Sequence, residues 1–383
     1  MRNENIYQPV MRSVYVAADN IISPIGNTTS QNMRQLKNGV SGIAEHHDIN
    51  SSPTPFYASL LNRNDYEADA TYTKFEKLLI ASVKDALTNC HISATDATTA
   101  LIVSSTKGNI GLLETEPDRP DLKERIALYT SAKLVCNYFG IVNKPIVISN
   151  ACISGIMAIL TGLRLIQTGQ YDNAIVVGAD VISKFVLSGF QSFKAVSDQP
   201  CKPFDANRTG ITLGEGAATI ILTANANYRN EVSVLAGAVS NDANHISAPS
   251  RTGEELGQAI TKSLSDAGLK AKNIDLVSAH GTATMYNDEM EARALSIAGL
   301  ANVPTNSLKG FYGHTLGAAG LIESIISIQS IQEGIILPTP GFETLGVSSP
   351  INIITAATPF AVKTFLKTAS GFGGCNGAVI FGN

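Results

Sequence analysis

A cysteine and two histidines in this sequence have the surroundings of catalytic residues. Cys152 follows a short apolar run at 145–149 and precedes the apolar, helix-patterned segment 154–167. A thiol at the start of a helix feels the positive end of the helix dipole, which favours the thiolate and nucleophilic attack. The sequence therefore predicts a nucleophile at Cys152, with a buried structural cysteine as the commoner alternative.

The two histidines each follow a predicted strand. His280 comes after the apolar run 274–279, and His314 comes after the run 303–307, each beside a glycine. Ligands of α/β proteins bind where the carboxyl ends of strands open onto a crevice. We therefore expect both side chains to line a site, with a structural histidine, buried or solvated, as the alternative at either position.

The segment 370–377, Ser-Gly-Phe-Gly-Gly-Cys-Asn-Gly, predicts a glycine-rich turn before the last strand. Glycine allows backbone N–H groups to approach a ligand closely. A phosphate-binding loop is disfavoured, because the segment has no Gly-Lys-Ser/Thr sequence and no helix is expected to follow it. A backbone donor to an oxyanion fits the segment better.

Alternating strands and helices must hold these segments in place. Strands are expected at 14–17, 100–103, 145–149, 174–179 and 217–222, and helices at 75–89, 125–139 and 154–167. The order β-α-β-α-β-α-β-β then repeats between 232 and 381, which predicts two copies of one α/β unit packed face to face. The boundary is placed near 224–229, so that residues 1–228 carry the nucleophile and residues 229–383 carry both histidines.

Composition narrows the class of protein. The chain has 383 residues, 44% hydrophobic and 16% charged, so it can bury a large core and is not a disordered protein. Its net charge of -4 argues against binding to nucleic acid. Five cysteines without a Cys-x-x-Cys pair favour reduced thiols in the cytoplasm, and neither disulfides nor a metal site. The polar start and the lack of an apolar run of about 18 residues argue against a signal peptide and a membrane helix.

Five motifs, in this order, resemble those of the β-ketoacyl-acyl-carrier-protein synthases of the elongating, Cys-His-His type. They are Cys152, the central stretch Pro203-Phe-Asp with Arg208-Thr-Gly and Gly214-Glu-Gly-Ala, His280-Gly-Thr, Lys309 with His314, and Gly371-Phe-Gly-Gly. The likeness extends from Val14 to the end of the chain. It implies the thiolase-like fold, an α/β fold with duplicated βαβαβαββ halves in a five-layered αβαβα arrangement. It also implies a homodimer, with a heterodimer as the alternative.

The resemblance implies a decarboxylative Claisen condensation without a bound cofactor. Cys152 would take an acyl group from the 4'-phosphopantetheine arm of an acyl carrier protein. Malonyl-carrier protein would then lose carbon dioxide, and its carbanion would attack the thioester. His280 and His314 would hold the malonyl thioester carbonyl, in a fatty-acid, polyene or polyketide type of chain elongation.

The resemblance also assigns supporting residues. Lys309 and Glu291 would form a charge pair that orients the histidines, with Asp288 beside them, although ordinary structural charges are the alternative. The backbone N–H groups of the nucleophile and of Phe372 would form the acyl oxyanion hole. Gly373 belongs to the same turn, and Phe372 would act as a gate between the acyl pocket and the malonyl site.

Two residues depart from the family pattern at the expected acyl pocket. Ile153 follows the nucleophile where the family usually has a small residue, which predicts a narrower channel mouth. Lys107 stands where fatty-acid enzymes have glycine or isoleucine, and a charge against an alkyl tail is unfavourable. We therefore expect short, polyunsaturated or aryl-primed chains rather than long saturated ones, unless Lys107 faces solvent or an acidic partner.

Docking of an acidic carrier protein requires local positive charge on a chain that is negative overall. Lys202 and Arg208 are the main candidates, and Lys202→Glu is expected to raise the KM for carrier protein. Lys123 and Arg125 are weaker candidates.

Single residues distinguish the sequence from families that are related to the elongating synthases. A thiolase would have Asn-Glu where this chain has His280-Gly, an initiating synthase would have asparagine in place of His314, and a chain-length-factor partner would lack the nucleophile. The alternative to an enzyme is a ketosynthase-like subunit that binds carrier protein without turnover. The presence of Cys152 favours the enzyme.

Overall fold

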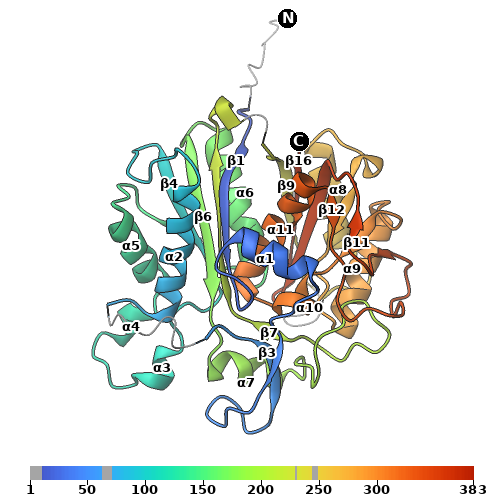
Figure 1. Cartoon of the computed structure of the whole chain (residues 1–383), viewed down its shortest axis with the longest axis horizontal. Coiled ribbons are helices and arrows are strands. Elements are labelled where there is room, and N and C mark those ends of the chain that lie inside the picture. The colour runs from blue at the N-terminus through green and yellow to red at the C-terminus, as the bar shows by residue number, and fades with distance from the viewer. Residues whose placement is uncertain (1–10, 63–70, 229–230, 244–248) are drawn as a thin grey trace, which may run out of the picture.

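The computed structural model, which describes residues 11–62, 71–228, 231–243 and 249–383, contains two α/β halves (Figure 1). The strands of the first half are β1 (Tyr15–Ile22), β4 (Thr99–Ser104), β5 (Ile146–Ile148), β6 (Asn173–Asp180) and β8 (Gly216–Thr223). Those of the second are β9 (Ser233–Asn241), β10 (Leu276–Ser278), β11 (Pro304–Asn306), β13 (Asn352–Ile353), β15 (Thr364–Gly371) and β16 (Cys375–Gly382). Their order across the sheet is β13-β11-β10-β15-β16-β9-β1-β8-β6-β4-β5.

Both halves use one pattern of strand pairing. In the first half β4 lies parallel to β5 and β6, whereas β8 lies antiparallel to β6 and β1. In the second half β10 lies parallel to β11 and β15, whereas β16 lies antiparallel to β15 and β9. This confirms the predicted duplicated α/β fold. The boundary at residue 228 lies beside residues outside the described ranges and stays a prediction.

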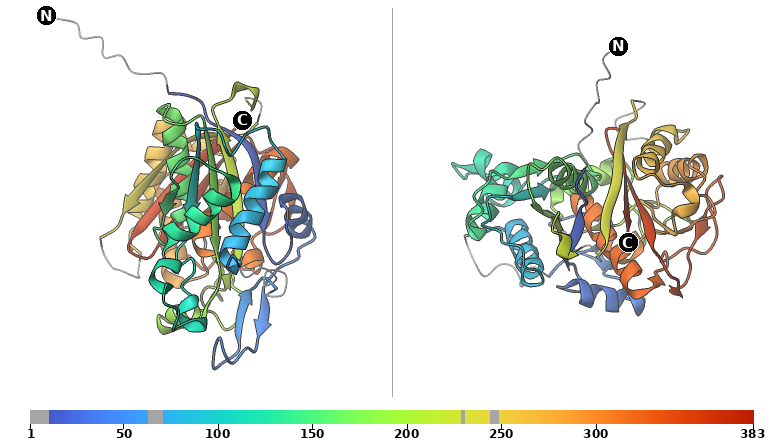
Figure 2. Two further views of the ribbon diagram at one scale, coloured as in Figure 1. Left: turned by 90° about the vertical axis from the view of Figure 1, so that its left-hand side faces the viewer. Right: turned by 90° about the horizontal axis from the view of Figure 1, so that it is seen from above.

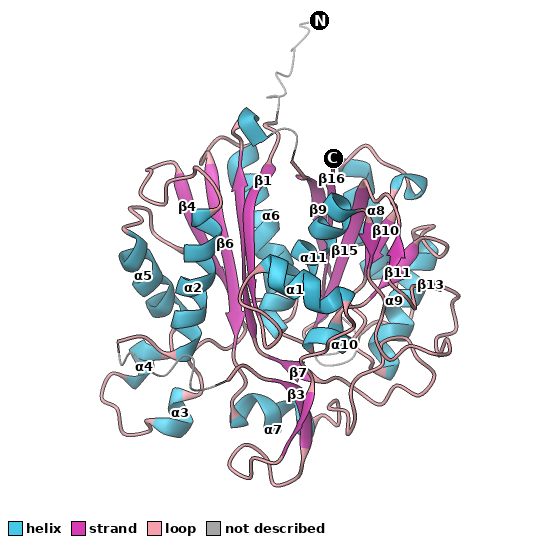
Figure 3. Cartoon of the chain, in the orientation of Figure 1, coloured by secondary structure: helices cyan, strands magenta, loops and turns pink. Residues whose placement is uncertain are grey.

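The helices complete five layers, in the order α-β-α-β-α (Figures 2 and 3). The outer faces are covered by α2 (Lys74–Thr88) and α5 (Leu128–Phe139) in the first half and by α8 (Glu254–Asp266) and α9 (Met285–Ile297) in the second, while α6 (Ser154–Gln167) and α11 (Ala319–Glu333) pack together in the middle. Every residue of β6 and β8 is buried, as expected for strands covered on both faces. Within the described ranges, no helix is both long and apolar enough to span a membrane.

Shorter elements surround this frame. The remaining helices are α1 (Thr29–Lys37), α3 (Leu112–Thr115), α4 (Leu122–Arg125), α7 (Lys184–Ser192) and α10 (Lys309–Tyr312). The remaining strands form two small sheets, one of β2 (Ala44–His46), β3 (Phe56–Ser59) and β7 (Leu213–Gly214), the other of β12 (Ile335–Ile336) and β14 (Thr358–Pro359). Of these elements, α7 and α10 border the site described below.

One predicted helix begins later than expected. The segment 125–139 was predicted as helical throughout, but α5 begins at Leu128 and residues 122–125 form the separate helix α4. The guanidinium of Arg125 instead pairs with the buried carboxylate of Glu76, at 2.6 Å. Glu76 also completes the capping box with Thr73 at the start of α2. Hydrophobic periodicity carries no information about such a long-range ion pair, and the pairing also removes Arg125 as a docking candidate.

Candidate active site

Cys152 lies in a tight turn between β5 and α6. Ala151 has a φ of 43°, a left-handed conformation that is unfavourable for a residue with a side chain and persists only where its surroundings hold it. The hydroxyl of Ser154 holds the turn, because it accepts from the N–H of Asn150 at 2.8 Å and donates to the carbonyl of Ala151 at 2.7 Å. The predicted strand-turn-helix arrangement around Cys152 is therefore present.

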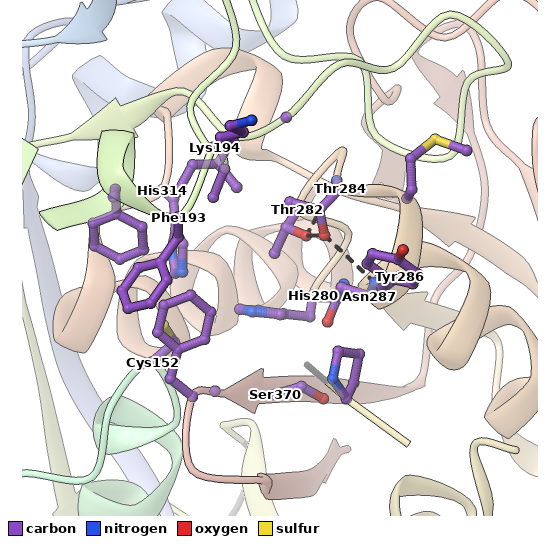
Figure 4. Close-up of a pocket in the computed structure, with 18 of the residues that line it drawn as sticks. Cys152, Phe193, Lys194, His280, Thr282, Thr284, Tyr286, Asn287, His314 and Ser370 are labelled. Atoms are coloured by element: carbon purple, nitrogen blue, oxygen red, sulfur yellow. Dashed lines mark hydrogen bonds between the residues drawn. The ribbon is translucent and has the colours of Figure 1, made fainter. Parts of the chain in front are cut away.

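The turn brings Cys152 together with both histidines (Figure 4). His280 follows β10, and His314 follows α10. The sulfur and one nitrogen of each imidazole all lie within 4.8 Å of one another, and the two ring centroids are 5.2 Å apart. All three side chains are buried. The site thus lies between the halves, with a sulfur from the first and two imidazoles from the second.

The resting state of Cys152 differs from the expected thiolate. Burial raises the pKa of its thiol to about 12, with a smaller contribution from Cys375, while the charge of Lys309 opposes the rise. The helix itself begins only at Ser154, two residues further on. A thiol with so high a pKa is protonated at neutral pH, and it must give its proton to a base before it can attack.

Both histidines are neutral and can interact with that proton. Burial, followed by the charge of Lys309, lowers the pKa of His280 and of His314 well below the usual range. The ammonium of Lys309 lies 3.3 Å from Nδ1 of His280. Since a lysine can only donate, Nδ1 accepts and the proton of His280 is on Nε2. His314 has no partner for Nδ1 among the described residues, so its tautomer is not fixed in this way.

The charge pair predicted between Lys309 and Glu291 is not formed. Lys309 pairs instead with Glu323 on α11, at 2.7 Å, and donates to the carbonyl of His280 at 2.6 Å. Glu323 was missed by the sequence reasoning, although an acidic residue in the apolar helical segment 319–331 is a recognisable signal. The partner of Lys309 therefore lies on α11 in the central layer, and not on α9.

Glu291 and Asp288, both on α9, hold the backbone around His280. Glu291 accepts the N–H groups of His280 and Gly281, at 2.8 and 2.7 Å. Asp288 accepts the N–H of Thr282 at 2.8 Å, and burial raises the pKa of its carboxyl to about 6. Both carboxylates therefore act on the segment 280–282 through its backbone, and neither touches an imidazole.

Arg208 is not a surface residue, which contradicts its predicted role in docking. It is only 5% exposed, donates to the carbonyls of Asp205 and Gly346 at 2.9 and 2.7 Å, and lies 3.9 Å from Asp288. Its guanidinium thus lies in the interior, between the segments that contain Asp205, Asp288 and Gly346. Lys202 is half-buried. A cation that the sequence reasoning missed, Lys194, is exposed at the rim of the cavity described next.

Two cavities meet at Cys152. One, of about 320 Å³, is lined by both histidines and reaches Thr282, Thr284, Tyr286 and Lys194. The other, of about 230 Å³, is lined by Thr106, Lys107, Phe185, Val186 and Leu316. Four residues border both cavities: Cys152, Phe190, Phe193 and Phe372. The ring of Phe372 packs against Phe190 and Phe193, with centroids 5.6 and 5.5 Å apart. Phe372 therefore stands at the junction of the cavities.

The glycine-rich turn lies against the nucleophile. A side chain at Gly371 would come within 3.0 Å of the backbone nitrogen of Cys152, so only glycine leaves this approach open. Gly373, with a φ of 87°, and Gly374, with a φ of 76°, have conformations that favour glycine. The turn can thus bring backbone groups close to an acyl group on the sulfur.

The two residues expected in the acyl pocket have different positions. Lys107 lines the 230 Å³ cavity and is also exposed to solvent, and it makes no ion pair with a described residue. Ile153 is 1% exposed and packs in the apolar core around α6, and it lines neither cavity. The prediction that Ile153 narrows a channel mouth is therefore wrong, because its side chain points into the core.

The three donors at the site are of kinds that can bind a metal ion. Sulfur and imidazole nitrogen are zinc ligands, and Cys152, His280 and His314 are close enough to share an ion. The proton on Nε2 of His280 opposes coordination through that nitrogen. The arrangement is better suited to proton transfer and to hydrogen bonding of an oxyanion.

Comparison with protein families matches nearly the whole chain. A family model described as the N-terminal domain of beta-ketoacyl synthase matches residues 11–227, and one described as the C-terminal domain matches residues 232–343. The 3-oxoacyl-[acyl-carrier-protein] synthase 2 of Vibrio cholerae is 30% identical over 97% of this chain and 99% of its own length. A putative mitochondrial 3-oxoacyl-[acyl-carrier-protein] synthase of Schizosaccharomyces pombe is 28% identical over 97% of this chain and 99% of its own.

Solved structures give the same result for the fold. The ishigamide ketosynthase/chain length factor has a TM-score of 0.89 and 26% identity, covering 97% of this chain and 99% of that one. The ketosynthase ApeO in complex with its chain length factor ApeC, from Xenorhabdus doucetiae, has a TM-score of 0.82 and 25% identity, covering 98% and 99%.

Proposed function

Because the chain belongs to the β-ketoacyl synthase family, we propose that it is an active condensing enzyme, which extends an acyl group held on Cys152 with two carbons from malonyl-carrier protein. The observation that carries the proposal is the meeting of a thiol and two neutral imidazoles at the junction of two cavities. One cavity can receive a growing chain while the other admits a carrier arm. The substrates would arrive on the 4'-phosphopantetheine of acyl carrier protein.

In the first half-reaction the sulfur of Cys152 attacks the thioester carbonyl of an acyl-carrier protein. The proton of the thiol passes to a neutral imidazole, for which His314 is suited because its Nδ1 has no described partner that fixes the tautomer. Backbone N–H groups at Cys152 and Phe372 would stabilise the oxyanion of the tetrahedral intermediate. The carrier thiol leaves with the proton, and the acyl group stays on Cys152.

In the second half-reaction malonyl-carrier protein occupies the larger cavity. His280 donates from Nε2 to the thioester carbonyl, and His314 donates to the same oxygen. The malonyl group then loses carbon dioxide, and both imidazoles stabilise the enolate that forms. The enolate carbon attacks the acyl carbonyl, the bond to sulfur breaks, and the thiolate of Cys152 takes up a proton from solvent through an imidazole. The product is a β-ketoacyl-carrier protein.

A labelling experiment tests the proposal directly. An acyl-carrier protein with a radiolabelled acyl group is incubated with the protein, and then malonyl-carrier protein is added. We expect label on the peptide that contains Cys152, followed by release of a labelled β-ketoacyl product. Binding of the carrier without transfer of label would instead identify a non-catalytic partner subunit.

The acyl substrate is proposed from the lining of the smaller cavity. Its walls include Phe185, Phe190, Phe193 and Phe372, and the solvent-exposed Lys107 also borders it. Flat rings pack well against conjugated or aromatic chains, whereas an ammonium disfavours an alkyl tail. The structures named for ishigamide and ApeO are similar in fold. We therefore favour short, polyunsaturated or aryl-primed chains.

Replacing Lys107 by isoleucine is expected to change this preference. The kcat/KM for a palmitoyl-carrier protein should rise by about tenfold, because an apolar contact replaces a charge along the chain. The measurement is condensation with saturated acyl-carrier proteins of graded length. Lys184→Ile, at an exposed lysine of α7 outside the cavity lining, serves as the control. Equal use of palmitoyl and short or aryl-primed chains by the unaltered protein would contradict the proposal.

Docking of the carrier is proposed at Lys194 rather than at Arg208. Lys194 is exposed at the rim of the larger cavity, where the phosphate of a pantetheine arm would pass. Lys194→Glu should raise the KM for carrier protein by about tenfold at low salt and less at high salt, with kcat unchanged. The same measurement on Lys202→Glu tests the candidate predicted from the sequence.

The control for docking is Lys270→Glu. Lys270 precedes β10, whereas His280 follows it, so this exposed lysine lies at the opposite end of the sheet from the site. An equal rise in KM for Lys194→Glu and Lys270→Glu would show that only overall charge matters. A homodimer or heterodimer and a cytoplasmic location stay predictions.

A further inference from the structure

A second lysine, Lys367, lies buried beside the site. It belongs to β15 and is 0% exposed. Burying an ammonium is unfavourable unless it is paired and hydrogen-bonded. Lys367 meets both conditions, since it lies 2.7 Å from Glu323 and donates to the carbonyls of Ser278 and Ala279 at 3.0 and 3.1 Å. These two carbonyls directly precede His280, so Lys367 holds the segment that carries this imidazole.

Glu323 joins the two lysines. Its Oε1 lies 2.7 Å from Lys309 and its Oε2 lies 2.7 Å from Lys367. Lys309 in turn contacts Nδ1 and the carbonyl oxygen of His280. One carboxylate on α11 therefore fixes two ammonium groups, and both of these bind the backbone at or next to His280.

The charges around the imidazoles come from four elements. They are Lys309 on α10, Glu323 on α11, Lys367 on β15, and Glu291 and Asp288 on α9. Lys367 offsets one of the carboxylates in this buried group. Its charge also helps to lower the pKa of both imidazoles, after burial and Lys309, and for His280 after His314 as well. Removing it would leave the histidines in a more negative environment.

We propose that Lys367 is a positioning residue for condensation, which shares Glu323 with Lys309 and fixes the strand end before His280. The inference rests on the proposed function and adds a residue to its site. It assigns Lys367 no contact with the substrate. Its effects should therefore appear in kcat and in the pH profile, and not in the binding of carrier protein.

The test compares three variants of the full chain: Lys367→Met, Lys363→Met and Glu323→Gln. Lys367→Met removes the charge, and Lys363→Met removes a charge from the exposed lysine just before β15 as a matched control. We expect Lys367→Met to lower kcat for condensation about 10- to 100-fold, with KM for malonyl-carrier protein within about threefold. The acidic limb of the pH profile should move to higher pH by about one unit, because the imidazoles protonate more readily.

For Glu323→Gln we expect a shift of the pH profile in the opposite direction, which distinguishes the proposed effect from a folding defect. Loss of this negative charge disfavours protonation of the imidazoles, so the acidic limb should move to lower pH although the rate falls. A general loss of structure would not shift the two limbs in opposite directions. If Lys367→Met does not fold, the pH profile of Glu323→Gln tests the proposal instead. An acidic limb that stays in place or moves to higher pH in this variant overturns the proposal.

The outcomes separate this inference from the proposed function. The inference alone is overturned if Lys367→Met folds, condenses as fast as Lys363→Met, and has the acidic limb of its pH profile at the same pH as the unaltered protein. The proposed function is overturned if neither the unaltered protein nor Lys363→Met condenses any acyl-carrier protein. In that case the pH dependence of the alkylation of Cys152 by iodoacetamide reports the same shifts, and equal profiles for all variants overturn the inference as well.

Discussion

Replacing Cys152 by alanine is expected to lower condensation by about 10⁴-fold or more, since the thiol that takes the acyl group in the first half-reaction is lost. The thiol is buried at the junction of both cavities, with the two imidazoles within 4.8 Å. Alanine fits the same space, so the fold should persist. The measurements are product formation with labelled acyl-carrier protein and the mass of the intact chain, which should show no acyl adduct.

Cys136→Ala is the matched control for this substitution. Cys136 is also buried and also has a pKa raised by burial, to about 11, but it lies on α5 in the outer layer. It should acylate and turn over like the unaltered protein. An acyl adduct or undiminished condensation in Cys152→Ala would remove Cys152 from the reaction.

The second large effect is expected for His280→Ala. Condensation should fall by about 10²- to 10³-fold, because the donor from Nε2 to the enolate oxygen is lost. Acylation of Cys152 should stay within about tenfold, since the backbone stabilises that oxyanion and His314 takes the proton. The two steps are measured separately, acylation by intact mass and condensation by release of labelled carbon dioxide.

The control is His91→Ala, at an exposed histidine outside the site. It should leave both steps unchanged. If His280→Ala slowed acylation and condensation equally, His280 would serve both oxyanions, and the division of roles between the backbone and the imidazoles would be wrong.

Residues adjacent to a recognisable turn were predictable from the sequence. The turn at Cys152 and the strand end before His280 are local patterns, and the repeated order of elements predicted two similar α/β halves packed face to face. The fold followed from the same repeat. In each case the signal lies within a few residues of the feature, where hydrophobic periodicity and glycine positions are informative.

Contacts between distant segments were not predictable in the same way. Glu323 rather than Glu291 meets Lys309, and Arg208 turns inward to Asp205 and Gly346. These outcomes depend on how helices of different layers are rotated against each other, which the pattern of one segment does not encode. Likewise the neutral thiol at Cys152 reflects its burial, a property of the assembled layers.

The equivalence of the two halves has a consequence for how the reactive groups are shared between them. The turn after β5 that leads into α6 corresponds, in the second half, to the segment after β11 that leads into α11. The first corner bears Cys152 and the second bears His314, and α6 and α11 lie against each other. The two corners thus lie around one reaction space and carry different reactive groups. The two halves therefore share a single centre, and neither half alone holds all three catalytic side chains.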